Sequence, residues 1–374
     1  MNIEVNKAAF IKAVSNACLV TAKRPVQPIL NGVYLDASES TMFLAATDLH
    51  RTLIQELTAT VTAPGRIVVD APKDVLKQLK AWPKADKLTI IVNDKQLTFK
   101  QGLFSFNAQS LDADDFPNIG TADQLVDNFS ADELDTIINR VAFAASSYDY
   151  HSILNAVNIK TENGNLDVCA TDGSRLVHYQ PMNRTSGAGI EKHNLNIPAD
   201  TFKLLGKVLN LKDKMPAGAG TPWSKCHLYT GKLESGHQGA TFEGEGFELT
   251  VRLISGDYPR YAKLFPVHQQ HYTVAHRDEL IAACKAAIAQ EPGTMLLRFE
   301  GLELKTAGGD SQASMSIQGQ TSDSTKFALN GKFLLDFISQ FKSDKVEIKR
   351  EVALKPMIIT EHDVRYLIMP VQSK

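Results

Sequence analysis

Two hydrophobic periods alternate along the chain. Apolar side chains recur every three or four positions in residues 5–24, which predicts a helix that buries Phe10, Val14 and Ala17 on one face. Stretches in which every second residue is apolar follow, and they predict strands. These strands cover residues 29–35, 41–46, 52–60, 88–92, 96–100 and 103–108, with a second helix from Pro72 between the third and the fourth strand.

The same order of elements returns twice. A helix over residues 132–145 follows Ser130, a favourable N-cap, and a helix at Pro198 corresponds to the helix at Pro72. The third passage has predicted helices at 277–289 and 330–341 and predicted strands at 295–299, 346–349, 357–360 and 364–369. Helix, strands, helix, strands is the order of an α+β domain with a large antiparallel sheet.

A repeated phrase supports this division. Ala46-Thr47-Asp48-Leu49-His50-Arg51 returns 124 positions later as Ala170-Thr171-Asp172-Gly173-Ser174-Arg175, and the sequences before both phrases keep the same offset. A fainter third copy, Leu304 to Asp310, lies 138 positions after Leu166 to Asp172. A constant offset over a long stretch indicates copies of one structural unit.

The copies predict three domains. Asp115-Phe116-Pro117 and Asp257-Tyr258-Pro259 close the first two copies, which places the domains at residues 1–121, 122–267 and 268–374. The second copy has an additional stretch rich in Pro, Gly and Ala, about residues 212–224, which reads as an inserted loop.

Composition narrows the class of protein. Of the 374 residues 43% are hydrophobic and 22% charged, and no apolar run approaches a membrane span. The N-terminus has no apolar segment of a secretory signal. The four cysteines lie far apart without a CxxC pair and read as reduced, mostly buried thiols. We therefore expect a cytoplasmic protein without a membrane anchor.

Charge is distributed unevenly between helices and the rest of the chain. The six predicted helical segments carry a net charge of +8 and the remainder −10, although the whole chain carries −2. Lys favours helices, but Glu favours them equally and is nearly absent from these segments. We interpret the pattern as a basic lining for a polyanion, with an acidic exterior.

Motifs of catalysis and of metal binding are missing. The ten His residues form no HxxxH or HxH pair beside carboxylates, and the chain has neither GxxxxGK[ST] nor GxSxG. Asp48, Asp172 and Asp310 recur at one place in each copy, and we expect them to bond to the backbone of their own turns. The sequence thus predicts no catalytic residue, no cofactor and no metal.

Four motifs occur in the order of one known family. They are Arg24-Pro25-Val26-Gln27-Pro28-Ile29-Leu30, Ala170 to Leu176, Gly256 to Pro266 and Tyr366 to Val371. Together with the three α+β copies they resemble the bacterial β sliding clamp, the processivity subunit of DNA polymerase III. The resemblance covers the whole chain.

The resemblance implies a ring. Two chains would pair head to tail to give six similar domains, with two helices of each domain lining the hole and the strands forming an outer sheet. Such a ring encircles duplex DNA without reading its sequence. It tethers the replicative DNA polymerase, the clamp loader and other proteins that carry clamp-binding peptides, which is processivity without chemistry.

The resemblance also assigns residues to three surfaces. A pocket for partner peptides would use Leu154, Thr171, Gly173, Ser174, Arg175, Leu176, Pro259, Lys263, Leu264, Phe333, Pro356, Leu367, Ile368, Met369, Pro370 and Val371, with Arg175 and Lys263 at its rim. DNA contacts map to Arg24, Lys73, Tyr148, Ser152 and Ile153. The dimer would join the edge strand with Leu103, Phe104, Phe106 and Ala108 to the third-domain helix with Lys285, Ile288 and Ala289.

Two other functions are compatible with triplicated domains. An enzyme would need a polar cluster unique to one copy, whereas the strongest phrase is shared between copies. A protein-only ring scaffold would not need basic helices. Within the repeated phrase, the copies differ at Gly173 and Ser174, which replace Leu49 and His50. We therefore expect Gly173 to Leu176, more than the Asp, to carry partner binding.

Overall fold

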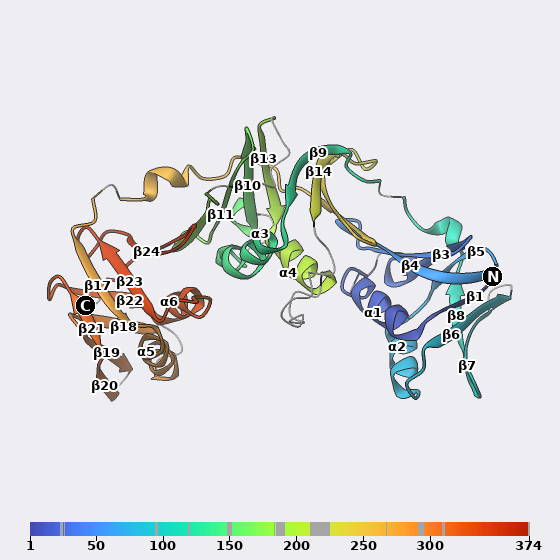
Figure 1. Cartoon of the computed structure of the whole chain (residues 1–374), viewed down its shortest axis with the longest axis horizontal. Helices are drawn as coiled ribbons and strands as arrows, with labels where there is room; N and C mark the ends of the chain where they lie inside the picture. Colours follow the sequence, from blue (N-terminus) through green and yellow to red (C-terminus); the bar gives the residue numbers. More distant parts are fainter. Residues whose placement is uncertain are drawn as a thin grey trace. The chain divides into compact units, whose positions relative to one another are not determined.

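The computed structural model describes residues 1–22, 25, 27–93, 96–118, 120–147, 152–182, 184, 191–209, 225–266, 268–290, 295–308 and 311–372. These residues divide into two compact units, Met1–Ala131 with Leu204–Leu253, and Asp132–Lys203 with Ile254–Lys374. The units cut the chain differently from the three predicted domains, whose boundaries stay a prediction. Figure 1 shows antiparallel sheets with helices packed against them.

The first unit holds one sheet of 12 strands in the order β1-β6-β7-β8-β5-β2-β3-β4-β16-β15-β14-β9, and β1 also pairs with β4. Its strands are β1 Asn2–Asn6, β2 Val33–Ser38, β3 Thr41–Thr47, β4 Arg51–Ala63, β5 Gly65–Val69, β6 Lys87–Asn93, β7 Gln96–Gln101, β8 Phe104–Leu111, β9 Gln124–Phe129, β14 Cys226–Lys232, β15 Gln238–Gly244 and β16 Phe247–Arg252. Helices α1 Lys7–Ala17 and α2 Pro72–Ala81 pack against each other, and short 3-10 turns occupy Pro28–Asn31 and Ala113–Asp115.

The second unit holds a sheet of 9 strands, β13-β10-β11-β12-β25-β24-β23-β17-β21, and a sheet of 4, β20-β19-β18-β22. The strands are β10 Ala156–Glu162, β11 Asn165–Thr171, β12 Arg175–Tyr179, β13 His193–Pro198, β17 His271–His276, β18 Leu296–Glu300, β19 Glu303–Gly308, β20 Ser311–Ser316, β21 Gly319–Thr321, β22 Lys326–Asn330, β23 Lys345–Arg350, β24 Met357–Glu361 and β25 Val364–Ile368.

Helices of the second unit are α3 Ala131–Thr136, α5 Arg277–Gln290 and α6 Gly331–Ile338, while α4 Ala199–Val208 runs across the division between the units. Helices α5 and α6 lie side by side (Figure 1). Short 3-10 turns occupy Ala142–Ala144, Ile153–Asn155 and Tyr261–Leu264, and a π-helical stretch occupies Ile137–Val141.

Most predicted elements are present, and the differences have local causes. The first helix begins at Lys7, because the Asn6 side chain accepts a hydrogen bond from Ala9 N at 2.9 Å, and strand β1 precedes it. Pro28 starts a 3-10 turn where a strand was expected. The strand proper begins after Gly32, where a Cβ would lie 2.4 Å from Val68 Cγ1.

Residues 132–145 are not one α-helix. The α-helix ends at Thr136, a π-helical stretch follows over Ile137–Val141, and a 3-10 turn completes the segment. Arg140 lies in the π-helical stretch and bonds to the side chains of Glu361 and Tyr366, the latter at 3.2 Å. A break of this kind often marks a place with a specific contact.

Candidate functional site

The two copies of the repeated phrase form the same turn. Asp48 Oδ1 accepts from His50 N at 3.0 Å and from Arg51 N at 2.7 Å. Asp172 Oδ1 accepts from Ser174 N at 2.9 Å and from Arg175 N at 3.0 Å. The Asp residues thus bond to their own turns, as predicted; Asp310 lies outside the described residues.

Arg175 is the centre of the second turn. Its Nε donates to Asp172 at 2.9 Å, one terminal nitrogen donates to Asp336 of α6 at 2.7 Å, and the other donates to the Phe143 carbonyl at 3.1 Å. The guanidinium lies 4.5 Å from the ring centroid of Phe333. Only 11% of the side chain is exposed. Arg175 therefore ties the turn to α6 instead of standing free at a rim.

Each turn starts a strand that pairs with the closing strand of the next predicted domain. Arg51 of β4 pairs with Val251 of β16, and Arg175 of β12 pairs with Ile368 of β25. Even the flanking bonds correspond: Arg252 N donates to His50 O, and Met369 N donates to Ser174 O, both at 2.9 Å. We call each of these strand pairings a seam.

The proposed pocket residues collect around the second seam, but they differ in exposure. Gly173, Ser174, Pro259, Lys263, Leu264, Met369 and Val371 are exposed, Leu154, Arg175, Phe333, Pro356 and Pro370 are half-buried, and Thr171, Leu176, Leu367 and Ile368 are buried. Leu176 and Leu367 belong to a core cluster with Tyr258 and Tyr261. The exposed apolar surface is therefore provided by Leu264, Met369 and Val371, which are 50%, 40% and 39% exposed.

A polar network that sequence reasoning missed lies behind this surface. Tyr261 OH donates to Asp167 of β11 and accepts from Lys160 Nζ of β10 at 3.1 Å. His178 Nε2 of β12 lies 3.2 Å from Asp167 Oδ2. Arg365 of β25 approaches His178 Nδ1 at 2.7 Å. A guanidinium can only donate, so Nδ1 accepts and the imidazole proton sits on Nε2, facing Asp167.

The network perturbs the acid–base properties of its members. Burial acts to raise the pKa of the Asp167 carboxyl, but hydrogen bonds from His178 and Tyr261 outweigh it, so that the pKa lies below its ordinary value. Burial and the Asp167 hydrogen bond raise the pKa of the Tyr261 phenol far above its ordinary value. Asp167 is therefore the acceptor and Tyr261 the donor at any pH near neutrality.

A buried ion pair also joins the second and third predicted domains. Arg140 meets Glu361 of β24, and 13% and 4% of the two side chains are exposed. The other oxygen of Glu361 accepts from Lys342 N at 2.7 Å and from Ser343 N at 3.0 Å. Burial raises the pKa of Tyr366, which accepts from Arg140, to about 12. The second seam is thus held by polar contacts as well as by strand pairing.

The predicted DNA residues are only partly described. Arg24 and Tyr148 lie outside the described residues. Lys73 is exposed on α2, whose Lys77 and Lys80 are exposed as well. Ser152 caps the 3-10 turn Ile153–Asn155 by accepting from Leu154 N at 3.3 Å, and Ile153 packs against the core cluster of Leu176. Among these residues, the lysines of α2 fit a phosphate contact best.

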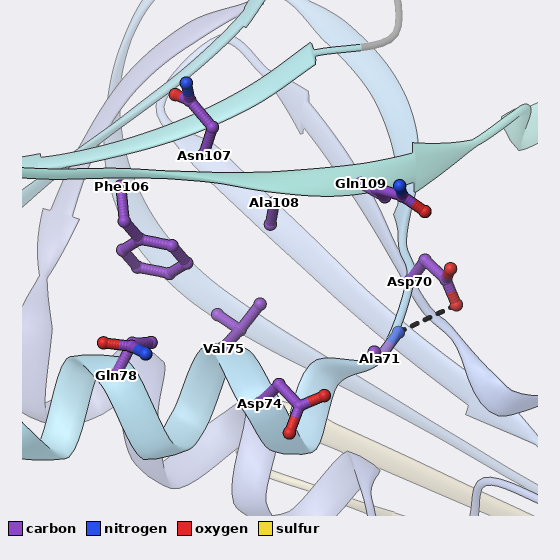
Figure 2. A pocket seen from close by; sticks show the side chains of 9 residues that line it. All are labelled: Asp70, Ala71, Asp74, Val75, Gln78, Phe106, Asn107, Ala108 and Gln109. Carbon is purple, nitrogen blue, oxygen red and sulfur yellow. Dashed lines mark hydrogen bonds between the residues drawn. The ribbon is translucent and has the colours of Figure 1, made fainter.

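Strand β8 has an open side among the described strands. Residues 104–109 pair with β7, and β5 pairs only with Ser110 and Leu111. A cavity of about 300 Å³ lies between β8 and α2, with Phe106 and Ala108 directed toward Val75 (Figure 2). Leu103 and Phe104 are exposed beside it. The predicted edge strand is therefore present with an apolar depression next to it.

The third predicted domain offers a second open edge. Strand β20 is the outermost strand of its sheet among the described strands. Helix α5 packs on the neighbouring strand β19 and carries exposed Lys285 and Ala289 and half-buried Ile288.

The described part of the chain contains no helix that could span a membrane. Cys169, Cys226 and Cys284 are buried free thiols, and Cys18 is partly buried.

Two family models match the chain. Residues 1–120 match the N-terminal domain of the DNA polymerase III beta subunit, and residues 128–260 match its central domain. Together the matches cover more than half of the chain.

Relatives extend the similarity to full length. The chain is 25% identical to the beta sliding clamp of Streptomyces coelicolor, over 100% of this chain and 99% of the relative, and 25% identical to that of Caulobacter vibrioides, over 100% of both. The fold is similar to the sliding clamp of Bacillus subtilis, with a TM-score of 0.87, 19% identity and full coverage of both chains. The Pseudomonas aeruginosa clamp bound to griselimycin is similar with a TM-score of 0.86 and 20% identity, again over the full length of both chains.

Proposed function

Because this chain belongs to the family of the DNA polymerase III beta subunit, the bacterial β sliding clamp, we propose that it is a DNA sliding clamp. Two copies form a ring around duplex DNA and tether the replicative polymerase and other clamp-binding proteins to it. The function is mechanical and needs no catalytic residue or cofactor. It places the protein in the cytoplasm, where bacterial DNA is.

The observation that carries the ring is the repetition of the seam. Within one chain, the strand after each of the first two turns pairs with the closing strand of the next domain. The strand after the third copy of the phrase is β20, which ends its sheet, and the closing strand of the first domain is β8, which has an open side. A second copy can supply each missing partner, and this satisfies both edges.

Such a pairing joins unlike surfaces head to tail. When the rotation between copies is half a turn, two copies close and no edge remains. Phe106 and Ala108 on β8 and Lys285, Ile288 and Ala289 on α5 are the side chains that we assign to this contact. The repeat supports the three domain boundaries at residues 121 and 267 in the same way, because each proposed domain then ends with a closing strand and its linker.

Two further surfaces complete the proposal. Exposed lysines on α1, α2 and α4 provide weak, sequence-independent contacts to phosphates, which permits sliding. Leu264, Met369 and Val371 form the apolar part of a surface for partner peptides, with Gly173, Ser174 and Lys263 beside them. The P. aeruginosa relative bound to griselimycin supports a ligand site on this kind of molecule.

Topological binding distinguishes this proposal from ordinary affinity. The protein is loaded on nicked circular DNA with a clamp loader, washed in high salt, and the DNA is then linearised. We expect retention on the circle and loss from the linear form. Equal retention on both forms contradicts the ring. As a matched control, Phe106→Lys should give the mass of one chain in light scattering and no retention on circles, while Leu264→Lys should leave both unchanged.

A further inference from the structure

The segment that carries Lys263 and Leu264 is attached to the sheet at two aromatic side chains. Tyr261 and Phe265 flank the two exposed residues. The ring of Tyr261 lies 4.3 Å from Lys160 Nζ, and the ring of Phe265 lies 4.5 Å from the Arg365 guanidinium. His178 lies against both aromatic rings, at 5.6 and 5.7 Å between centroids. Both ends of the 3-10 turn thus rest on the same polar network.

We propose that the network of Lys160, Asp167, His178, Arg365 and Tyr261 positions the segment 259–265 and thereby sets the affinity of the peptide surface. These are positioning residues, since none of them needs to touch the peptide. The inference rests on the proposed peptide surface and extends it to a buried layer behind that surface.

The first copy of the repeat does not contain this network among the residues that the structure describes. The 124-residue offset places Asp36, Phe43 and Ile54 of the first copy at the positions of Lys160, Asp167 and His178. Strand pairing confirms the equivalence, because Asp36 pairs with Phe43 and Lys160 pairs with Asp167. The first copy therefore has a carboxylate in place of the Lys160 ammonium and apolar side chains in place of Asp167 and His178. A function that belongs to one domain should depend on residues at which the copies differ.

The network also joins all parts of the proposed surface. Lys160, Asp167 and His178 come from strands of the second predicted domain, Tyr261 and Phe265 from the closing turn of the same domain, and Arg365 from the third domain. A shift of Tyr261 would move Lys263 and Leu264 relative to Met369 and Val371. Because side chains must converge to bind an apolar anchor, such a shift weakens binding without removing a contact residue.

The molecule offers a matched pair of substitutions. Tyr258 and Tyr261 belong to the same core cluster, and the centroids of their rings lie 6.2 Å apart. Tyr261 OH bonds to Asp167 and Lys160, whereas Tyr258 OH donates a long bond, 3.4 Å, to the Ala156 carbonyl and bonds to no charged side chain of the network. Tyr261→Phe and Tyr258→Phe therefore remove the same atom from similar surroundings, but only the first breaks the network.

Binding of griselimycin to the full-length protein is the test. We expect Tyr261→Phe to weaken binding about tenfold, as for the loss of one hydrogen bond to a charged acceptor, and Tyr258→Phe to change it less than about twofold. Hydrogen exchange in residues 259–265 should accelerate in Tyr261→Phe alone. Both variants should keep the wild-type mass and retention on circular DNA.

A double-mutant cycle on griselimycin binding gives a second measurement, and a general loss of stability would not reproduce its result. Asp167→Asn combined with Tyr261→Phe should weaken binding by less than the sum of the two single effects, since both substitutions weaken the Tyr261–Asp167 hydrogen bond. Equal affinity of wild type and Tyr261→Phe would overturn the positioning role alone. Absence of griselimycin binding by the wild type would overturn the proposed peptide surface and the positioning role with it, while the ring would still be judged by its retention on circular DNA.

Discussion

The two Thr-Asp turns share a backbone and differ in what they hold. Thr47 and Thr171 accept from the third residue of the turn, at 3.0 and 3.1 Å, and donate to the carbonyl of the Arg, at 2.9 and 2.6 Å. In the first turn, Asp48 receives both Nε and a terminal nitrogen of Arg51. In the second, the terminal nitrogens of Arg175 reach Asp336 and the Phe143 carbonyl. In the second copy, this shared local frame thus carries contacts from the Arg to residues far away in the sequence.

The backbone of the turn is therefore the same in both copies, whereas the contacts of its side chains differ between them. The residues that keep the turn closed are the same in both copies, so they report architecture. The residues that differ are the fourth and fifth of the phrase, Leu49 and His50 in the first copy and Gly173 and Ser174 in the second, and they report what distinguishes the second seam.

Replacing the Arg of each turn should give the largest difference in stability between the two copies. Arg175→Ala leaves the partly buried Asp172 without its cation and leaves Asp336 with Lys332 alone, and it should lower the free energy of unfolding of its unit by about 3 kcal/mol. Arg51 is more exposed, at 23% of its side chain, so Arg51→Ala should cost about 1 kcal/mol. Urea unfolding of both variants measures the difference, and equal losses would contradict the special role of Arg175.

The threonines should show the opposite behaviour. Thr47→Val and Thr171→Val each remove a hydroxyl that donates and accepts within the turn, so both should cost about 1–2 kcal/mol. Thr47 also accepts from Thr52 Oγ1 at 3.1 Å, so we expect losses of similar size in urea unfolding, with that of Thr47→Val no smaller. A loss confined to Thr171→Val would mean that the second turn alone depends on this frame.

The fourth residue of the phrase tests backbone strain. Leu49 and Gly173 both adopt positive φ, 70° and 91°, a conformation that costs a non-glycine residue about 1 kcal/mol. Gly173→Ala should therefore destabilise by about 1 kcal/mol, since no heavy atom lies within 4 Å of the added Cβ. Thermal unfolding measures both variants. Leu49→Gly should be neutral or slightly stabilising, and a clear loss of stability would show that the Leu49 side chain stabilises its turn.

The smallest expected effect is on the pH dependence of stability. The pKa of Asp167 is lowered on folding, so its ionised form stabilises the protein above the unfolded value of about 4. This contribution disappears as the pH falls through the lower, folded pKa. The difference in unfolding midpoint between wild type and Asp167→Asn should thus be full above about pH 4 and shrink below it. Phe43→Leu, at the equivalent place in the first copy, should show no such convergence.

Local chemistry in the sequence was enough to predict the turns and the helix starts. Pro72 begins its helix and the Asp residues cap their turns, because these effects act within a few positions. Strands β1, β9 and β17 were missed, since each is short and precedes a helix directly. In β1, Ile3 and Val5 alternate with polar residues, but the helical pattern that starts at Lys7 hid this signal.

The sequence names residues for the candidate site, and that location stays a prediction, whereas the exposure and contacts of these residues could not be predicted. The family resemblance gathers its residues around one seam, but exposure depends on packing that no motif encodes, so Leu176 and Leu367 proved to be core residues. Arg175 was expected at a rim, and its partners Asp336 and Phe143 lie too far away in sequence to be foreseen. The network of Asp167 had a readable signal: a carboxylate stands where the first copy has Phe43.

The proposed contact between β8 and β20, each of which has an open side in the described part of the chain, determines where DNA enters the proposed ring. In the proposed ring, the β4–β16 and β12–β25 seams each lie within one polypeptide, so parting them would strain a continuous chain. The β8–β20 seam has no such covalent backing, and symmetry provides it twice. A closed DNA circle must therefore pass through one of two equivalent gates, while the other acts as a hinge. The strength of this single contact then governs both loading and the residence time on DNA.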